Sequence, residues 1–281
     1  MKKVIMMLAV VAAVCGCERV VMDDETAADV VQVKRVRFDV SSEGWMITRA
    51  LTADGQDMTD LWIFDYVDGG LVRTLHKMET DVDFNEPTMP LVYGEHTVYF
   101  VASRGKSPTV TGTQITWGSP SDTFWKALTL NVGSGTASTV AVTLNRVVTK
   151  LRIVVADEVP ATIATLEMVP GQWWYGLDYL TGEAVANSDA VRQVTVPASM
   201  AGTTGQLAVS FYCLSDDAEW VADVTIMAKD GDGAVIGSVS LADVPFVRNR
   251  VTDASGNLFA SQSGFSISLN DKWIDSYTLE W

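Results

Sequence analysis

The two histidines of the chain, His76 and His96, are the first residues to consider for catalysis, because imidazole is the most frequent general acid or base. Each lies in an alternating, strand-like segment and not in a nucleophile motif. The sequence also lacks the HExxH, GxSxG and Walker patterns that place a metal, a nucleophile or a phosphate. We therefore expect exposed or edge-strand histidines and a protein that is not an enzyme.

Two glycine-rich segments resemble parts of ligand-binding loops. Residues 230–233 (DGDG) have the acidic spacing that begins a calcium loop, but the twelfth position is Leu241, where such a loop needs a bidentate glutamate. Residues 133–135 (GSG) lack the rest of a phosphate-binding fingerprint. We interpret both segments as turns between strands and expect no metal and no cofactor.

The amino terminus has the pattern of a bacterial lipoprotein signal. Two lysines precede an apolar run over residues 4–14, which is too short for a membrane-spanning helix of about 20 residues. The run ends at Cys15, Gly16 and Cys17, a segment that resembles a lipobox. Cys17, which follows the small Gly16, is the predicted lipidated residue. Cys15 is the second candidate, and an ordinary secretory signal is the remaining alternative.

Lipidation at Cys17 has consequences for the rest of the chain. Residues 1–16 would be removed as a signal peptide, and the acidic residues 17–29 would form a tether. Several acyl chains on one cysteine would hold the protein firmly at the outer membrane. Cys213 would be the single free thiol, so neither a disulfide nor a thiolate metal cluster is expected.

Composition and charge exclude other classes of protein. The 35 acidic and 20 basic side chains give a net charge of −15, which argues against binding to nucleic acid. A hydrophobic content of 48%, with nine Trp, seven Tyr and nine Phe, argues against intrinsic disorder. Aromatic and branched residues are typical of strands, so the composition predicts an all-β protein.

Alternating apolar and polar residues predict where the strands lie. Val31 and Val33 alternate with polar neighbours, the phase shifts at residues 34–35, and residues 36–40 continue it, as in a strand with a bulge or bend. The turn at residues 68–70 (DGG) predicts a hairpin. Further strands are predicted over residues 61–67, 71–77, 96–103, 125–132, 137–144, 147–155, 162–168, 191–196, 205–214, 219–229, 234–241, 259–269 and 277–281.

The spacing of these segments is typical of β-sandwiches, which have turns about every 8 to 12 residues. No long segment has a helical period, so helices should be few and short. We expect two β-sandwich domains in tandem, one over residues 30–146 and one over residues 147–281.

The densest aromatic cluster comprises Trp173, Trp174, Tyr175 and Tyr179. Such rings can contact a glycan or a partner surface, and Trp173, Trp174 and Tyr175 are the candidates for that contact. The alternative is that the rings fill space between the two domains.

The order of several segments resembles the fimbrillin superfamily of Bacteroidales (type V) pili, which includes FimA-type stalk subunits and FimB-type anchors. These segments are the predicted lipobox, the strand over 31–40, residues 47–50 (ITRA) with 60–65 (DLWIFD), residues 145–151 (NRVVTKL), and residues 247–252 (VRNRVT) with 256–258 (GNL). The resemblance implies two transthyretin-like β-sandwich domains, export as a lipoprotein, and assembly on the outer membrane by strand exchange.

The resemblance also implies how assembly would occur. In stalk members an arginine-specific protease removes the first strand, and a strand of another subunit fills the exposed groove. Arg49 and Ala50 fit the cleavage position best, with an uncleaved anchor as the equal alternative. Tyr277, Leu279 and Trp281 alternate with polar residues and could form the donor strand, or they could form the last strand of their own sandwich.

These inferences together predict a structural, anchor or accessory subunit of a surface-exposed fimbrium, held at the outer membrane by lipid. Its partners would be other fimbrial subunits, through β-augmentation, and surface ligands of host or bacterial origin, but not nucleic acid. The alternative is a surface lipoprotein that binds glycan or protein and never polymerises.

Overall fold

The computed structural model of the protein describes residues 31–42, 45–46, 58–215, 219–260, 264–270 and 279–280. Contacts within the chain make Val33–Trp281 one compact unit. Most of the described residues lie in strands, and their one helical segment is a short 3₁₀ turn over Ala198–Met200. They form no helix long and apolar enough to cross a membrane. The all-β prediction is therefore confirmed.

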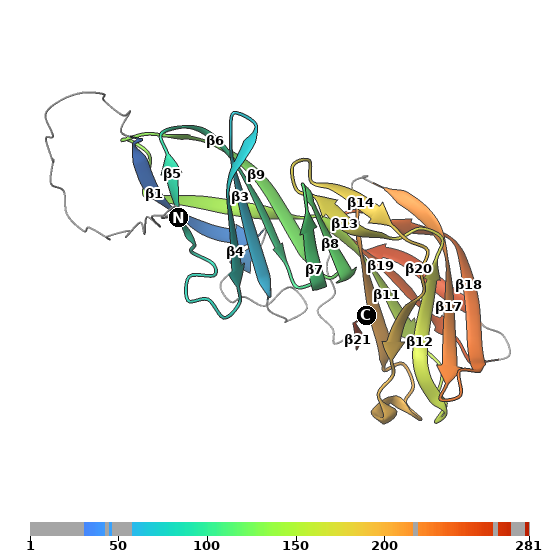
Figure 1. Ribbon diagram of the computed structural model, residues 1–281. Coiled ribbons are helices and arrows are strands. Elements are labelled where there is room, and N and C mark those ends of the chain that lie inside the picture. Colours follow the sequence, from blue (N-terminus) through green and yellow to red (C-terminus); the bar gives the residue numbers. More distant parts are fainter. Residues whose placement is uncertain are drawn as a thin grey trace, which may run out of the picture. The chain divides into compact units, whose positions relative to one another are not determined.

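The first sheet has eight strands in two layers (Figure 1). Strands β9 and β10 pair only at Asn145↔Trp125 and Arg146↔Phe124, so the sheet turns a corner there. One layer has β2, β1 and β10, with β5 paired to β1, and the other has β9, β6, β3 and β4. Their bounds are β1 Val33–Ser42, β2 Trp45–Met46, β3 Asp60–Val67, β4 Gly70–Met78, β5 Thr88–Val92, β6 Gly94–Ser103, β9 Thr123–Val132 and β10 Thr139–Arg146.

Alternation along β1 decides which of its side chains enter the core between these layers. Val36, Phe38 and Val40 are buried, whereas Val31 and Val33 are exposed. The pairing of β1 with β5 runs from Val33 to Arg37 without a shift in register. The predicted bulge or bend is therefore wrong, because the apparent change of phase comes from Val33 on the outer face of a regular strand and from Val31, which precedes that strand.

A four-stranded sheet covers part of the outer face of this first sheet. It has the order β14-β13-β8-β7, with bounds β7 Lys106–Thr111, β8 Gln114–Ser119, β13 Trp174–Asp178 and β14 Glu183–Asn187. Ile115 and Leu177 of this sheet share a core with Trp62 and Phe64 of β3. Strand β3 is therefore buried on both faces, which explains its unbroken apolar run.

The remaining two sheets pack face to face as a sandwich. One has the order β20-β19-β11-β16-β21 and the other β15-β12-β17-β18. Leu151 and Phe211 from the first sheet and Leu166 and Ile226 from the second meet in its core. The bounds are β11 Val148–Val155, β12 Ile163–Pro170, β15 Arg192–Thr195, β16 Leu207–Leu214, β17 Trp220–Asp230, β18 Val235–Phe246, β19 Val251–Asn257, β20 Gly264–Asn270 and β21 Leu279–Glu280.

Strands β7 and β8 precede residue 146, while β13 and β14 follow it, yet all four lie in one sheet. The division of the chain near residue 146 stays a prediction. Lysine is seldom fully buried, yet the side chain of Lys150 on β11 is, with Nζ 5.5 Å from the centre of the Tyr212 ring.

Candidate functional site

The strand-exchange hypothesis depends on β1, which lies between β5 and β10. It pairs antiparallel with β5 from Val33 to Arg37 and parallel with β10 from Arg37 to Ser42. The residues just before β5 continue this pairing: the amides of Phe38 and Val40 donate to the carbonyls of Pro87 and Asn85 at 2.9 and 3.0 Å. The backbone of β1 is thus bound on both sides along most of its length.

The inward side chains of β1 fill a groove between the two layers. The ring of Phe38 meets the ring of Phe100 edge to face, with centroids 5.1 Å apart. Burial of each of Val36, Phe38 and Val40 contributes about 1.5–3 kcal/mol. Without β1, this groove would be lined by apolar side chains of the neighbouring strands, among them Met89, Leu91, Phe100, Val142 and Leu144.

Cys17, Arg49 and Ala50 lie outside the described residues, as do the predicted signal peptide and tether. Arg49 stands in the chain between β2 and β3, so a cut after it would leave β1 attached only by non-covalent contacts. The side chains of Arg35 and Arg37 are exposed, but their backbones take part in the ladder with β5.

The carboxyl-terminal tail includes the predicted donor residues. Tyr277 and Trp281 lie outside the described residues. Leu279 lies in β21, which pairs parallel with β16 through Val209↔Leu279 and Ser210↔Glu280. Here the tail adds a short strand to a sheet of its own chain, and its use as a donor stays a prediction.

The residues of the aromatic cluster lie in two different hydrophobic cores: Trp173 in the core of the second sandwich and Tyr179 in the core beside β3. Trp173 is fully buried, donates from Nε1 to the carbonyl of Tyr212 at 2.8 Å, and packs edge to face on Phe246. Trp174 and Tyr175 are half-buried. Trp173 is therefore a core residue of one sandwich, whereas Trp174 and Tyr175 keep partly exposed surface, and their use as contact residues stays a prediction.

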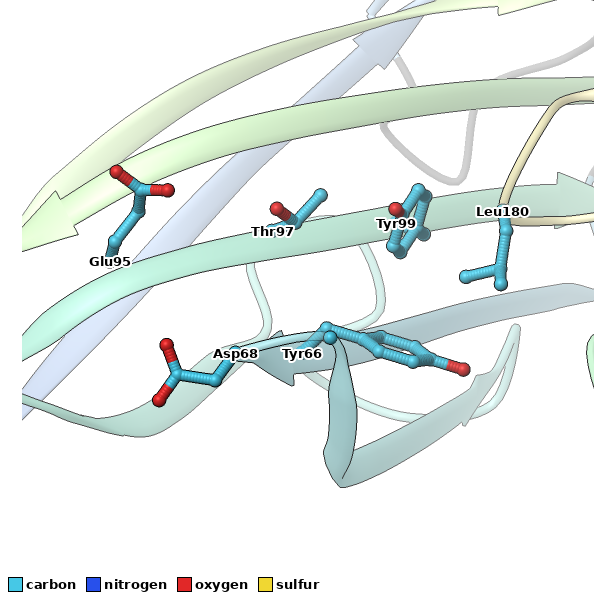
Figure 2. A pocket seen from close by; sticks show the side chains of 7 residues that line it. Tyr66, Asp68, Glu95, Thr97, Tyr99 and Leu180 are labelled. Atoms are coloured by element: carbon cyan, nitrogen blue, oxygen red, sulfur yellow. The ribbon is translucent and has the colours of Figure 1, made fainter.

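A pocket of about 230 Å³ opens on the outer face of the first sheet, where the cover of the β13–β14 hairpin ends (Figure 2). We call it the tyrosine pocket. It is built from the turn of the β3–β4 hairpin, from β6, and from the β13–β14 turn. Its lining residues are Tyr66, Asp68, Gly69, Glu95, Thr97, Tyr99 and Leu180. The sequence predicts the hairpin at residues 68–70 but not this pocket, whose parts are far apart in the chain.

A chain of phenol groups fixes the inner wall of the tyrosine pocket. Tyr179 donates its hydroxyl proton to the carbonyl of Gly112 at 3.2 Å. Its oxygen lies 3.1 Å from the hydroxyl of Tyr66, so Tyr66 is the donor of that bond. Burial is the main cause that raises the pKa of Tyr179 above its ordinary value, and the nearby charge of Asp178 adds to it. Burial likewise raises the pKa of Tyr99.

The glycine-rich segments are turns, as predicted. Asp230 accepts the amides of Asp232 and Ala234 at 3.0 and 2.8 Å and so closes the β17–β18 hairpin. Residues 133–136 form the turn between β9 and β10. Within the described part of the chain, no three His, Cys, Asp or Glu side chains are grouped as metal ligands.

The two histidines differ from each other. His76 lies on the edge strand β4, as expected, and its ring stacks on Trp62 at 4.7 Å. His96 lies on the interior strand β6 and is 1% exposed, so the expectation was wrong for this residue. Its Nε2 donates to the carbonyl of Val92 at 2.8 Å, and Nδ1 lies 2.6 Å from Asp65. Both ring nitrogens are therefore occupied by protein groups, which suits a structural role.

A family model described as a family of unknown function (DUF6562) matches residues 109–280. The chain belongs to this family. The match begins within β7 and includes the other three strands of the sheet that covers β3, namely β8, β13 and β14. No curated protein matches this member of the DUF6562 family.

Solved structures share the fold of this DUF6562 protein. A "putative adhesin" from Bacteroides ovatus is 14% identical over 79% of this chain and 88% of its own, with a TM-score of 0.52. "Putative polysaccharide binding proteins" from Bacteroides thetaiotaomicron are 11% identical over 85% and 96%, with a TM-score of 0.51. A "putative cell adhesion protein" from Bacteroides uniformis is 13% identical over 88% and 99%, with a TM-score of 0.50. The chain thus has the β-sandwich fold that the resemblance to fimbrillins implies.

Proposed function

We propose that the protein is a structural subunit of a cell-surface pilus, in an anchor or accessory position, lipidated at Cys17 and joined to other subunits by β-strand donation. The observation that carries this proposal is the position of β1. It is the first described strand, it fills an apolar groove with alternate side chains, and Arg49 follows it in the sequence before β3 begins.

Strand donation requires that a foreign strand can take the place of β1. The groove accepts three alternate apolar side chains, while β5, the loop after residue 84 and β10 supply hydrogen bonds from both sides. Main-chain bonds would give affinity, and the spacing of apolar side chains would give specificity. The shared fold with proteins named as adhesins and cell adhesion proteins supports a role at the cell surface.

The position of the subunit can be tested by intact mass of the protein from its own outer membrane. An anchor is expected as an acylated chain that begins at Cys17, with or without an active arginine-specific protease. A lipid-free chain that begins at Ala50 would instead identify a cleaved stalk subunit. The variant Arg49→Lys keeps the charge but resists that protease, so the shorter species should disappear in it.

Strand donation can be tested on the purified protein. After cleavage at Arg49, a labelled peptide of residues 31–42 should enter the groove and remain bound. The same peptide with Phe38→Ser is the matched control and should not bind, because it loses the side chain that meets Phe100. A cleaved chain that takes up neither peptide nor a strand of another subunit would contradict strand donation. The non-polymerising alternative would then be preferred.

A further inference from the structure

The tyrosine pocket is a second candidate site, separate from the β1 groove. Its walls come from the face of the first sheet that carries Tyr66 and Tyr99, whereas β1 packs against the opposite face, among Leu61, Ile63 and Phe100. Nothing in strand donation requires this pocket. Its chemistry can therefore be considered independently.

The open end of the pocket is acidic. Figure 2 shows Asp68 and Glu95 at one end, Leu180 at the other, and Tyr66 and Tyr99 between them. Asp68 and Glu95 are exposed, and among the described residues that line the pocket there is no lysine or arginine. Since the whole chain has a net charge of −15, the long-range field also favours a cationic ligand.

The inner wall of the pocket offers an acceptor. Tyr66 donates its single hydroxyl proton to Tyr179. A ligand can therefore interact only with the oxygen lone pairs of Tyr66, which accept hydrogen bonds. The carboxylates of Asp68 and Glu95 also only accept. Three of the polar groups around the pocket thus require donors, and a guanidinium group has five N–H donors and no acceptor.

The aromatic walls are held in place before any ligand binds. Tyr66 and Tyr99 meet edge to face, with ring centroids 5.5 Å apart and planes at 88°. Tyr179 stacks on Phe64 at 3.7 Å and fixes the Tyr66 hydroxyl. A planar guanidinium can stack on a tyrosine ring while its N–H groups reach carboxylates, a combination that an ammonium group provides less well.

We propose that the tyrosine pocket binds the guanidinium group of an arginine side chain displayed by a partner protein. Asp68 and Glu95 accept its N–H groups, and the ring of Tyr66 or Tyr99 receives its planar face. The pocket is large enough for the end of one side chain, which suits an anchor residue within a wider protein contact.

The proposal is tested by titrating the full mature chain with Nα-acetyl-arginine methylamide and, separately, with the citrulline analogue, which is the neutral isostere of arginine. Tyrosine ring signals in NMR spectra report binding. Saturable shifts of Tyr66 and Tyr99 are expected with the arginine probe. Binding of the citrulline probe should be about tenfold weaker or absent, because it lacks the charge that strengthens each hydrogen bond.

The affinity of single variants for the arginine probe tests which residues form the site. Glu95→Gln and Asp68→Asn should each raise Kd for the arginine probe about two- to fivefold, as expected for exposed charge pairs. Asn tolerates the left-handed backbone of Asp68, whose φ is 49°, so both variants should fold. Tyr99→Leu should raise Kd about threefold through loss of the ring face. The matched control Glu79→Gln, an exposed acid outside the pocket, should leave Kd unchanged.

Three outcomes would overturn the proposal. The first is equal binding of arginine and citrulline probes. The second is an effect of Glu79→Gln as large as that of Glu95→Gln, since that would mean general attraction to an acidic surface. The third is saturation of the pocket by a methyl glycoside but not by arginine, which would make it a sugar site. None of these depends on Arg49 cleavage, so failure here and failure of strand donation remain distinguishable.

Discussion

Tyr179 connects the fold to the tyrosine pocket through a single side chain. It is 1% exposed, stacks on Phe64, and both accepts from Tyr66 and donates to the carbonyl of Gly112. Deprotonation of Tyr179 would remove the donor that Gly112 requires and would place a charge among aromatic rings. Its neutral form is therefore part of the folded state.

This gives a prediction for alkaline pH. Burial raises the pKa of Tyr179 above 10.0, its value in the unfolded chain. Below pH 10 both states hold the proton and stability is unaffected; above it the unfolded chain loses the proton first, so stability falls as pH rises. In Tyr179→Phe this decline should be smaller, while the lost hydrogen bonds should cost about 1–3 kcal/mol at pH 7. Urea unfolding between pH 7 and pH 11 measures both effects.

The matched control is Tyr66→Phe, which leaves the bond between Tyr179 and Gly112 intact. The alkaline decline should persist in this variant. If Tyr179→Phe and the unchanged protein lost stability equally above pH 10, the decline would have to come from other groups, such as Tyr99, whose pKa is also raised by burial.

At the scale of elements, the β13–β14 hairpin is the part that covers β3 and closes one end of the tyrosine pocket. Its turn contacts β9: the indole of Trp125 donates to the carbonyl of Tyr179 at 2.8 Å. Gly182 lies directly against the same indole and has φ of +75°. Close approach and a left-handed backbone both require glycine here.

We predict that Gly182→Ala destabilises the protein by about 2–4 kcal/mol. A Cβ at this position would lie 2.8 Å from the Trp125 ring, which adds a packing cost to the cost of the positive φ. Gly202→Ala is the control, because Gly202 has φ of +72° but no atom within 4 Å of the added Cβ. It should cost only about 1–2 kcal/mol. If urea unfolding gave the same loss in free energy of unfolding for Gly182→Ala and Gly202→Ala, the hairpin would not pack closely against Trp125.

The sequence predicted elements whose signals are local. The hairpin after β3 was predicted correctly, and Asp68 and Gly69, with φ of 49° and 76°, form the two-residue turn that its DGG signal favours. The strands of the sheet that covers β3 were missed. Strand β7 is exposed along its length and contains a proline, and β13 lies in the aromatic cluster, where the sequence predicts ring contacts or packing but no strand. These strands pair between segments about 60 residues apart, which no local pattern reveals.

The same reason limits prediction of sites. The alternation of Val36, Phe38 and Val40 was sufficient to predict a strand with an apolar face, and hence a groove. Burial of His96 and Lys150 depends on distant neighbours, Asp65 in one case and Tyr212 in the other. The tyrosine pocket combines three separate segments. Only the turn at its rim has a signal in the sequence.

At the scale of the whole molecule, one of the three hydrophobic cores of the described residues combines residues from both sides of residue 146. Trp62 and Val101 share one core with Tyr212 and Leu214. Arg146 adds a polar link, since it pairs with Asp122 at 2.7 and 2.9 Å and donates to Asn249 at 3.1 Å. We therefore expect the described strands to unfold in one cooperative transition.

Asp122→Asn tests this link. The side chain of Asp122 is 1% exposed and that of Arg146 9%, so neutralising the carboxylate removes a buried partner of the guanidinium and should cost about 3–5 kcal/mol. Glu86→Gln is the control: its partner Arg37 is half-exposed, and the loss should be at most about 1 kcal/mol. Tryptophan fluorescence and far-ultraviolet circular dichroism should report the same lowered urea midpoint for Asp122→Asn. Two separate midpoints would mean that the sandwiches unfold independently, and Arg146 would then stabilise only the sheet corner at which β9 meets β10.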